Sequence, residues 1–385
     1  MSAFTNRALP EVLSFIVDNR GRSCPTAESG FPLIATNCLR EGERYPTFEN
    51  IRHVSEETRQ SWFRAHPEPG DVLLVCKGSP GRVAVVPDPV PFCIAQDMVA
   101  LRANSELVHP GYLYYRLKAP DVQRAIPNLH VGTMIPHFKK GDFGKLRFDV
   151  HDDLSEQRAI AEVLGALDDK IAANAELAVR AEDLMAATYE RSLLAGARQA
   201  PLGTVAEFHN RRRVPLSARQ REQRVGPVPY YGATGVFGYV DEALFDERLV
   251  LVGEDGSVVL PDGLPVVQYV WGPAWVNNHA HVLTGVGLST EVLRLAIQRT
   301  NVAPIVTGAV QPKISMGNLR GLTLDIPGQG QMSAVEPEVD ALCAVVRAKV
   351  EESRTLTNMR DTLLPQLMAG KIRVRDAERV FEGVV

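Results

Sequence analysis

The 385-residue sequence predicts an α+β fold in which two mixed α/β domains are separated by two long antiparallel coiled-coil helices. Three observations predict it: motifs that recur at a nearly constant offset, two uninterrupted heptad patterns, and short β-type runs bounded by glycine and proline. The predicted domains are residues 1–150 and 201–332, and the predicted helical segments are residues 151–200 and 333–385. The chain is therefore expected to be an internal duplication with pseudo-two-fold symmetry.

An internal repeat supports the duplication. The segment Gly132-Thr-Met-Ile-Pro136-His-Phe138 is similar to Gly308-Ala-Val-Gln-Pro312-Lys-Ile314, 176 positions later. Residues 149–150 and 325–326 keep the same offset, and residues 193–196 resemble residues 367–370 at an offset of 174. Because this period is far longer than that of a solenoid, each copy is expected to contain one globular block followed by one long helix.

Both helical segments carry a heptad pattern. Apolar residues alternate at spacings of four and three, which is typical of a coiled-coil seam. Ser155 is the predicted N-cap of the first helix, and the second helix is predicted to end near Pro365. Two such seams in one chain most simply pack on each other in antiparallel orientation. The seam includes Ile160, Leu164, Leu167, Ile171 and Asn174 in the first helix and Val339, Leu342, Val346, Leu356 and Leu363 in the second.

The globular blocks contain short β-type runs. Glycine and proline bound each run, as expected for strands joined by turns. The runs are residues 72–75, 83–86, 249–252 and 266–270. They predict a sheet in each block.

Composition restricts the class of protein. No stretch of about 18 consecutive apolar residues occurs, so no membrane-spanning helix is expected, and the N-terminus lacks the apolar run of a signal peptide. The five cysteines are widely spaced and include no Cys-x-x-Cys, which argues against a disulfide framework or a zinc ribbon. A reducing cytoplasm is the predicted location.

Charge is unevenly distributed along the chain. The formal net charge of −4 argues against a general polyanion-binding protein, but residues 151–200 carry 5 Lys+Arg against 10 Asp+Glu, whereas residues 1–150 carry 18 against 16. Between residues 211 and 224, six arginines face only one acidic residue, Glu222. A solvated loop would explain such a cluster equally well, but arginine also makes bidentate contacts with DNA phosphates and guanine edges.

Motifs for catalysis are weak. The sequence contains neither the P-loop pattern Gly-x-x-x-x-Gly-Lys-Ser/Thr nor the Asn-Pro-Pro-aromatic segment of amino-methyltransferases. Glu254, Asp255, His279 and His281 suggest a metal site, but Gly253-Glu-Asp-Gly256 is more typical of a tight turn after a strand. We therefore expect neither a catalytic residue nor a metal site in this chain.

Several segments resemble type I restriction-modification specificity (S) subunits. Residues 154–171 resemble the central helical region of these subunits, and residues 363–374 resemble the close of their second helical region. Residues 307–315 with Asn318-Leu319 are similar to the end of a target recognition domain, and residues 230–235 with 253–256 resemble its middle. The resemblance covers nearly the whole chain, although we recognise no motif of the family in residues 28–68.

This resemblance implies a DNA-binding scaffold without chemistry of its own. Two target recognition domains would each recognise one half of a bipartite, asymmetric double-stranded DNA target, and the helices would set the spacing and dock the partner subunits. Two methyltransferase (M) subunits would bind S-adenosylmethionine and methylate a flipped adenine. Restriction (R) subunits would supply ATP-dependent translocation and Mg²⁺-dependent cleavage. The chain itself is expected to hold no cofactor and to bind no membrane.

The candidate DNA contacts are cationic residues in the predicted loops. They are Lys77, Arg82, His137, Lys139 and Lys140 in the first domain and Arg211, Arg212, Arg213, Arg219, Arg221, Arg224 and Lys313 in the second. Two hypotheses from other functional classes stay open. One is a metal-dependent DNA nuclease that uses His279, His281, Glu254 and Asp255, and the other is a coiled-coil adaptor that binds no DNA.

Overall fold

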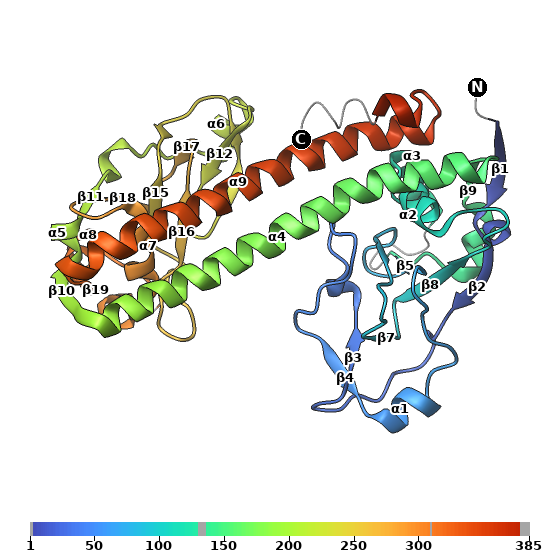
Figure 1. Cartoon of the computed structure of the whole chain (residues 1–385), viewed down its shortest axis with the longest axis horizontal. Coiled ribbons are helices and arrows are strands. Elements are labelled where there is room, and N and C mark those ends of the chain that lie inside the picture. The colour runs from blue at the N-terminus through green and yellow to red at the C-terminus, as the bar shows by residue number, and fades with distance from the viewer. Residues whose placement is uncertain (1–2, 130–135, 309, 378–385) are drawn as a thin grey trace. The chain divides into compact units, whose positions relative to one another are not determined.

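The computed structural model describes residues 3–129, 136–308 and 310–377. The chain divides into two compact units, unit 1 (Met1–Ala175 with Glu351–Val385) and unit 2 (Glu176–Val350). Two long helices, α4 (Leu154–Gly196) and α9 (Gln329–Met368), each contribute one part to each unit (Figure 1). Residues 132–135 and Ala309 of the repeated motif lie outside the described residues.

The described residues of unit 1 form three sheets. The largest is antiparallel and has the strand order β2-β8-β5-β6. In the second sheet β3 pairs antiparallel with β4 and parallel with β7, and in the third β1 pairs antiparallel with β9. The strands are β1 (Phe4–Ala8), β2 (Leu13–Val17), β3 (Phe31–Ile34), β4 (Arg52–Val54), β5 (Val72–Val75), β6 (Val83–Val85), β7 (Cys93–Ile94), β8 (Met98–Ala103) and β9 (Arg147–His151).

The main core of unit 1 forms where a helix covers the largest sheet. Tyr112, Tyr114 and Tyr115 of α2 are fully buried and belong to the same apolar cluster as Leu74 of β5 and Leu101 of β8. Such aromatic side chains bury large apolar areas and dominate the energetics of a core. The helices of unit 1 other than α4 and α9 are η1 (Leu9–Val12), η2 (Thr36–Cys38), α1 (Glu56–Ser61), α2 (Pro110–Lys118), α3 (Pro120–Leu129) and η3 (Lys140–Lys145).

Unit 2 repeats this arrangement. Its antiparallel sheet has the order β11-β18-β15-β16, β12 pairs antiparallel with β13 and parallel with β17, and β10 pairs antiparallel with β19. One additional strand, β14, pairs with β17. The strands are β10 (Ala197–Pro201), β11 (Ala206–Phe208), β12 (Val228–Tyr231), β13 (Val236–Val240), β14 (Phe245–Asp246), β15 (Leu249–Gly253), β16 (Val267–Val270), β17 (Pro273–Val276), β18 (Ala280–Gly285) and β19 (Thr323–Pro327).

Helix α7 follows β18 in unit 2 as α2 follows β8 in unit 1, and it buries Val292, Leu293 and Ile297. The shared order of elements confirms the predicted α+β fold and its internal duplication. The four predicted β-type runs correspond to β5, β6, β15 and β16. The shorter helices of unit 2 are α5 (Leu202–Val205), η4 (Asn210–Arg212), α6 (Ala218–Glu222), α7 (Thr290–Gln298), η5 (Ala303–Ile305) and α8 (Met316–Gly321).

The long helices pack antiparallel within each unit (Figure 1). In unit 1, Asp168 of α4 binds Arg360 of α9 at 2.6 Å, and Lys170, further along α4, lies 3.4 Å from the earlier residue Glu352. In unit 2, Thr188 donates a hydrogen bond to Glu338 at 3.2 Å. Residue numbers thus rise along one helix as they fall along the other, as expected for an antiparallel pair.

The predicted seam is buried along both helices. Seven of its residues belong to the buried apolar clusters, and Ile171 and Leu342 pack against those clusters in partly buried positions. Asn174 is 3% exposed, and its Nδ2 atom has no hydrogen-bond partner among the described residues. A lone polar group on a seam costs stability but disfavours other registers. The seven clustered residues are Ile160, Leu164, Leu167, Leu356 and Leu363 in unit 1 and Val339 and Val346 in unit 2.

The helix ends differ in detail from the sequence prediction. The predicted N-cap, Ser155, is wrong, because α4 begins at Leu154 and the carboxylate of Asp153 accepts the backbone N–H of Ser155 at 2.8 Å. Helix α9 continues to Met368, and Gly370 adopts a φ of +60° directly after it. Within the described ranges, every helix is too short or too polar to cross a lipid bilayer.

Candidate nucleic-acid interface

Three loops of unit 1 meet at the end of β5. The backbone N–H of Gly78 donates to the carbonyl of Pro136 at 3.1 Å, and that of Phe138 donates to the carbonyl of Cys76 at 2.7 Å. The N–H of Cys76 donates to the carbonyl of Asp97, just before β8, at 2.7 Å. Gly78 has a φ of +85°, a conformation that favours glycine, so the loop after β5 turns sharply here.

Unit 2 has the same loop framework at the end of β15. The N–H of Gly256 donates to the carbonyl of Pro312 at 3.0 Å, and that of Ile314 donates to the backbone carbonyl of Glu254 at 2.8 Å. The N–H of Glu254 donates to the carbonyl of His279, just before β18, at 2.8 Å. The two prolines that accept these bonds are those of the repeated sequence motif. The sequence repeat is therefore a structural repeat at the same place in each unit.

The framework of unit 1 lines a cationic cleft of about 400 Å³. Lys77 Nζ lies 3.8 Å from the carboxylate of Asp97, and both side chains are more than 40% exposed. Burial and the nearby charges of Arg20, Lys139 and Lys77 lower the pKa of His137, which favours its neutral form. The cleft is lined by Arg20, Gly21, Arg22, Ser23, Lys77, Gln96, Asp97 and His137.

The other predicted contacts of unit 1 lie on its surface. Arg82 and Lys139 are exposed, and within the described residues their side chains make no hydrogen bond or ion pair. Lys140 lies 4.0 Å from Asp18, which also binds Arg20. The sequence analysis missed Arg20. This residue lies shortly after the C-terminal end of β2, which is next to the start of β8, as is the C-terminal end of β5.

The arginine cluster of unit 2 separates into bound and unbound side chains. Arg212 binds Glu247 at 2.5 Å, and Arg224 binds Asp241 at 2.9 Å. By contrast, Arg211 and Arg219 are exposed and have no side-chain partner among the described residues. The guanidinium of Arg221 lies 5.3 Å from the ring centroid of Tyr230. Of the six arginines, Arg211 and Arg219 are thus the freest to contact a phosphate.

Arg213 is bound beneath the loop framework. Its side chain is 13% exposed, and it donates to the Glu254 carboxylate at 2.7 Å and to the Ala280 carbonyl at 2.7 Å. Lys313 Nζ lies 3.5 Å from the other oxygen of Glu254. Burial alone would raise the pKa of Glu254, but the hydrogen bond from Arg213 and the surrounding cationic groups lower it. Arg213 therefore holds the framework together in this structure.

The residues of the nuclease hypothesis do lie close together. His279 Nδ1 is 2.5 Å from the carboxylate of Asp255, and His281 Nδ1 is 3.7 Å from that of Glu254. However, His281 Nε2 donates to the carbonyl of Ile314 at 2.8 Å, and burial lowers the pKa of its imidazole. The described part of the chain contains no group of three or more His, Cys, Asp or Glu side chains able to hold a metal ion.

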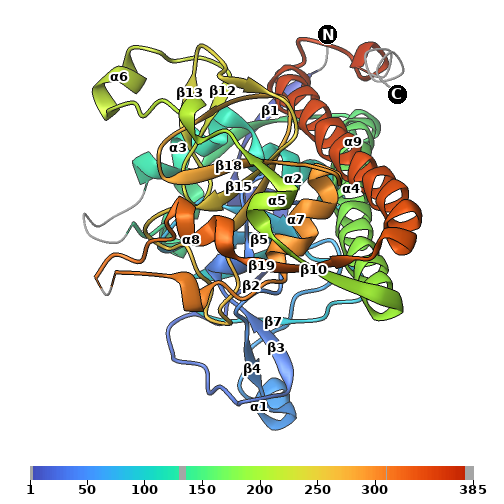
Figure 2. The same cartoon turned by 90° about the vertical axis from the view of Figure 1, so that its left-hand side faces the viewer.

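The framework of unit 2 lines a cleft of about 610 Å³ beside α6 and the β12–β13 hairpin, which lie together at one end of the unit (Figure 2). Its lining differs from that of unit 1, because it includes a tyrosine, a phenylalanine and two asparagines. The sequence analysis missed Phe237 and left Asn278 without a DNA-binding assignment, since neither is cationic. The polar and aromatic lining comprises Ser217, Arg221, Tyr230, Thr234, Phe237, Asp255, Ser257, Asn277, Asn278 and His279.

Comparison with known proteins identifies part of the chain. Residues 26–182 match the family model of the type I restriction modification DNA specificity domain. These residues therefore resemble the DNA specificity domain of type I restriction-modification systems. A curated relative, the putative type I restriction enzyme specificity subunit S.HindORF215P of Haemophilus influenzae, is 31% identical over 146 residues. That alignment spans 38% of this chain and 37% of the relative, so little more than a third of the relative's length is matched.

The fold of the whole chain is that of a solved S subunit. The type I restriction-modification S subunit from M. genitalium aligns with 95% of this chain and 96% of its own at 18% identity, with a TM-score of 0.60. The HsdS subunit from Thermoanaerobacter tengcongensis aligns with 96% of this chain and 97% of its own at 17% identity, with a TM-score of 0.38. The first likeness shows a common fold, and with the specificity domain it confirms the resemblance predicted from the sequence.

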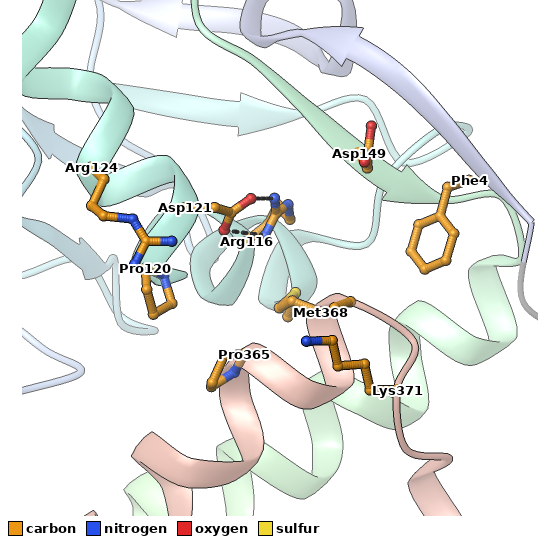
Figure 3. Close-up of a pocket in the computed structure, with 10 residues that line it drawn as sticks. Phe4, Arg116, Pro120, Asp121, Arg124, Asp149, Pro365, Met368 and Lys371 are labelled. Atoms are coloured by element: carbon orange, nitrogen blue, oxygen red, sulfur yellow. Dashed lines mark hydrogen bonds and ion pairs between the residues drawn. The ribbon is translucent and has the colours of Figure 1, made fainter.

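A further pocket of unit 1, about 390 Å³, lies beside α2, α3, the β1–β9 pair and the C-terminal end of α9 (Figure 3). Arg116 is 3% exposed and binds Asp121 there at 3.0 Å. Arg124 and Lys371 are exposed and have no ionic partner within the described residues, and Met368 supplies apolar surface. None of the predicted DNA contacts lines this pocket.

Proposed function

We propose that this chain is the DNA-specificity subunit of a type I restriction-modification complex. Each unit binds one half of a bipartite, asymmetric target through its cleft and the free cations around it. The observation that carries this proposal is that one backbone framework occurs twice with different side chains in the two clefts. A common framework places each cleft at the duplex in the same way, whereas side chains distinguish bases, so two clefts with different side chains bind two different half-sites.

The proposed partners perform the chemistry. Two methyltransferase subunits bind S-adenosylmethionine and methylate adenine, and restriction subunits use ATP and Mg²⁺. The long helices set the spacing between the half-sites and dock these subunits. The pocket with Arg124 and Lys371 suits an acidic segment of such a partner, since it combines apolar surface with two unpaired cations. A cytoplasmic location follows from the proposed DNA substrate.

The two other functional classes receive less support. For a nuclease, the Glu254 carboxylate and the His281 imidazole would have to give up the partners that they bind in the framework. For an adaptor that binds no DNA, the match of residues 26–182 to a DNA specificity domain would have no explanation.

Mapping methylated adenines in the host genome, with and without this gene, tests the proposal. We expect a bipartite motif with a fixed gap that is methylated only when the gene is present. Inserting four residues, about one helical turn, into both α4 and α9 should lengthen that gap. An unchanged methylation map after deletion of the gene would exclude the proposed function.

The unbound arginines of unit 2 provide a second test. Replacing both Arg211 and Arg219 with alanine should reduce the slope of log K against log salt concentration by about 0.9 per lost phosphate contact, or about 1.8 in total. Binding of duplex DNA by the full complex is measured between about 50 and 200 mM salt. Arg180→Ala, on the exposed surface of α4, is the matched control and should leave the slope unchanged. Equal slopes for the control and the double variant would remove these arginines from the interface.

A further inference from the structure

The cleft of unit 2 presents two side chains suited to recognising a base pair. Asn278 is exposed, and among the described residues its side-chain amide makes no hydrogen bond. Phe237 is 61% exposed, so most of its side chain is accessible to a ligand. Both line the same cleft of about 610 Å³. Among the described residues, neither side chain takes part in the hydrogen bonds of the loop framework.

The backbone around Asn278 is held firmly although its side chain is free. The guanidinium of Arg213 donates to the carbonyl of Asn278 at 3.2 Å. On its two sides, the N–H of Asn277 donates to the carbonyl of Tyr231 at 3.0 Å, and the N–H of His279 donates to the Asn277 side chain at 2.8 Å. The Asn278 amide therefore extends from a fixed turn, which lowers the entropic cost of binding a ligand.

The ring of Phe237 is fixed as well. A Cβ atom added to Gly232 would overlap this ring, so the ring lies directly against the glycine backbone across the β12–β13 hairpin. Only glycine leaves room for the ring at this position. One face of an exposed aromatic ring is thus placed beside the cleft, where Arg221 supplies positive charge.

These groups match the major-groove edge of one A·T pair. An asparagine amide makes a bidentate contact with N6 and N7 of adenine, and an apolar side chain contacts the methyl group of thymine. We propose that Asn278 recognises adenine and Phe237 contacts a thymine methyl group, so that the half-site bound by unit 2 includes an A·T pair. This inference rests on the proposed function and names the base that the cleft selects. The cleft of unit 1 has no asparagine, phenylalanine, tyrosine or tryptophan in its lining, and the amide of its Gln96 donates to Arg22 and Ser23.

Duplexes with single-atom changes test the assignment. The full chain with its methyltransferase subunits is first used to select a target from randomised duplexes. Each adenine of the half-site assigned to unit 2 is then replaced by 7-deaza-adenine, which lacks N7, and each thymine by uracil, which lacks the methyl group. At one pair the wild type should lose roughly tenfold or more in affinity on loss of N7 and about fourfold on loss of the methyl group.

The variants show whether these two residues make the contacts. Asn278→Ala should be insensitive to 7-deaza-adenine and Phe237→Ala insensitive to uracil at that pair, although each binds the natural duplex more weakly. Asn278→Asp should shift the preference there from adenine to cytosine, because a carboxylate accepts from the cytosine amino group. Asn301→Asp and Tyr239→Ala are matched controls outside the cleft lining and should respond to both base changes as the wild type does.

The outcomes separate this inference from the proposed function. If the wild-type complex selects no sequence, the proposed function itself fails. If it selects a bipartite sequence but the Asn278 and Phe237 variants keep the wild-type response to both base changes, the function stands and the A·T assignment is overturned. If sensitivity disappears only in the matching variant, the assignment holds.

Discussion

The two units place different side chains at one position of a common loop framework. In unit 1 the residue that begins the loop after β5 is Cys76, and burial raises the pKa of its thiol to about 12. Among the described residues of unit 1, the most buried ion pair joins Asp168 and Arg360 of the long helices. In unit 2 Glu254 occupies the position of Cys76 and is bound by Arg213. The backbone hydrogen bonds of the framework are the same in both units. A framework held by backbone groups can thus exchange a thiol for an ion pair and change its cleft without changing the fold.

The largest effect is expected in the helix pair of unit 1. Asp168 and Arg360 are 2% and 3% exposed, and Tyr115 also donates to Asp168 at 2.7 Å. Asp168→Ala leaves the buried Arg360 guanidinium with only the exposed carboxylate of Asp361 and the carbonyl of Gly42 as partners. It should cost about 3–4 kcal/mol of unfolding free energy, measured by urea denaturation. Lys170→Ala, which removes a pair that is 43% and 30% exposed, should cost less than about 1 kcal/mol. If the two variants lost similar amounts of unfolding free energy, burial would not make the Asp168–Arg360 pair the more important one.

A somewhat smaller loss is expected beneath the cleft of unit 2. Arg213→Ala deprives Glu254 of its nearest cationic partner and should cost about 2–4 kcal/mol, because both side chains are mostly but not fully buried. Arg219→Ala, which removes an exposed and unpaired arginine, should change stability by less than about 0.5 kcal/mol. Hydrogen exchange should locate the Arg213→Ala loss in β15 and β18. Loss of protection confined to unit 1 would contradict the comparison.

The smallest effect concerns pH and His281. Burial lowers the pKa of this imidazole in the folded protein, so below about pH 6.5 the unfolded chain binds the proton more readily. The stability contributed by neutral His281 is therefore present above this pH and is lost as pH falls toward the folded pKa. Between pH 7.5 and 5.5, thermal unfolding should show that His281→Gln loses up to about 1 kcal/mol less unfolding free energy than the wild type. If the stability of the two proteins changed with pH in the same way, His281 would not contribute to the pH dependence.

Sequence reasoning located the candidate site better than its individual contacts. The repeated proline motif marked the loop framework in both units, since its spacing is preserved where the backbone hydrogen bonds are preserved. The arginine cluster was recognised as one feature, but three of its six members are bound by carboxylates. These acidic partners come from other loops and strands, so no local pattern distinguishes a bound arginine from a free one. Phe237 was missed because an exposed aromatic residue on a strand looks like a core residue in the sequence.

By itself, the sequence determined the long helices, the duplication and the family resemblance. Heptad spacing and repeated motifs depend on neighbours along the chain, and their physical meaning does not require knowledge of the fold. Only the tertiary structure decided that Glu254 and His281 serve the framework and that Asn278 and Phe237 share a cleft. The reason is that strand pairing brings distant side chains within hydrogen-bonding distance, and those contacts decide which polar groups stay free to bind a ligand.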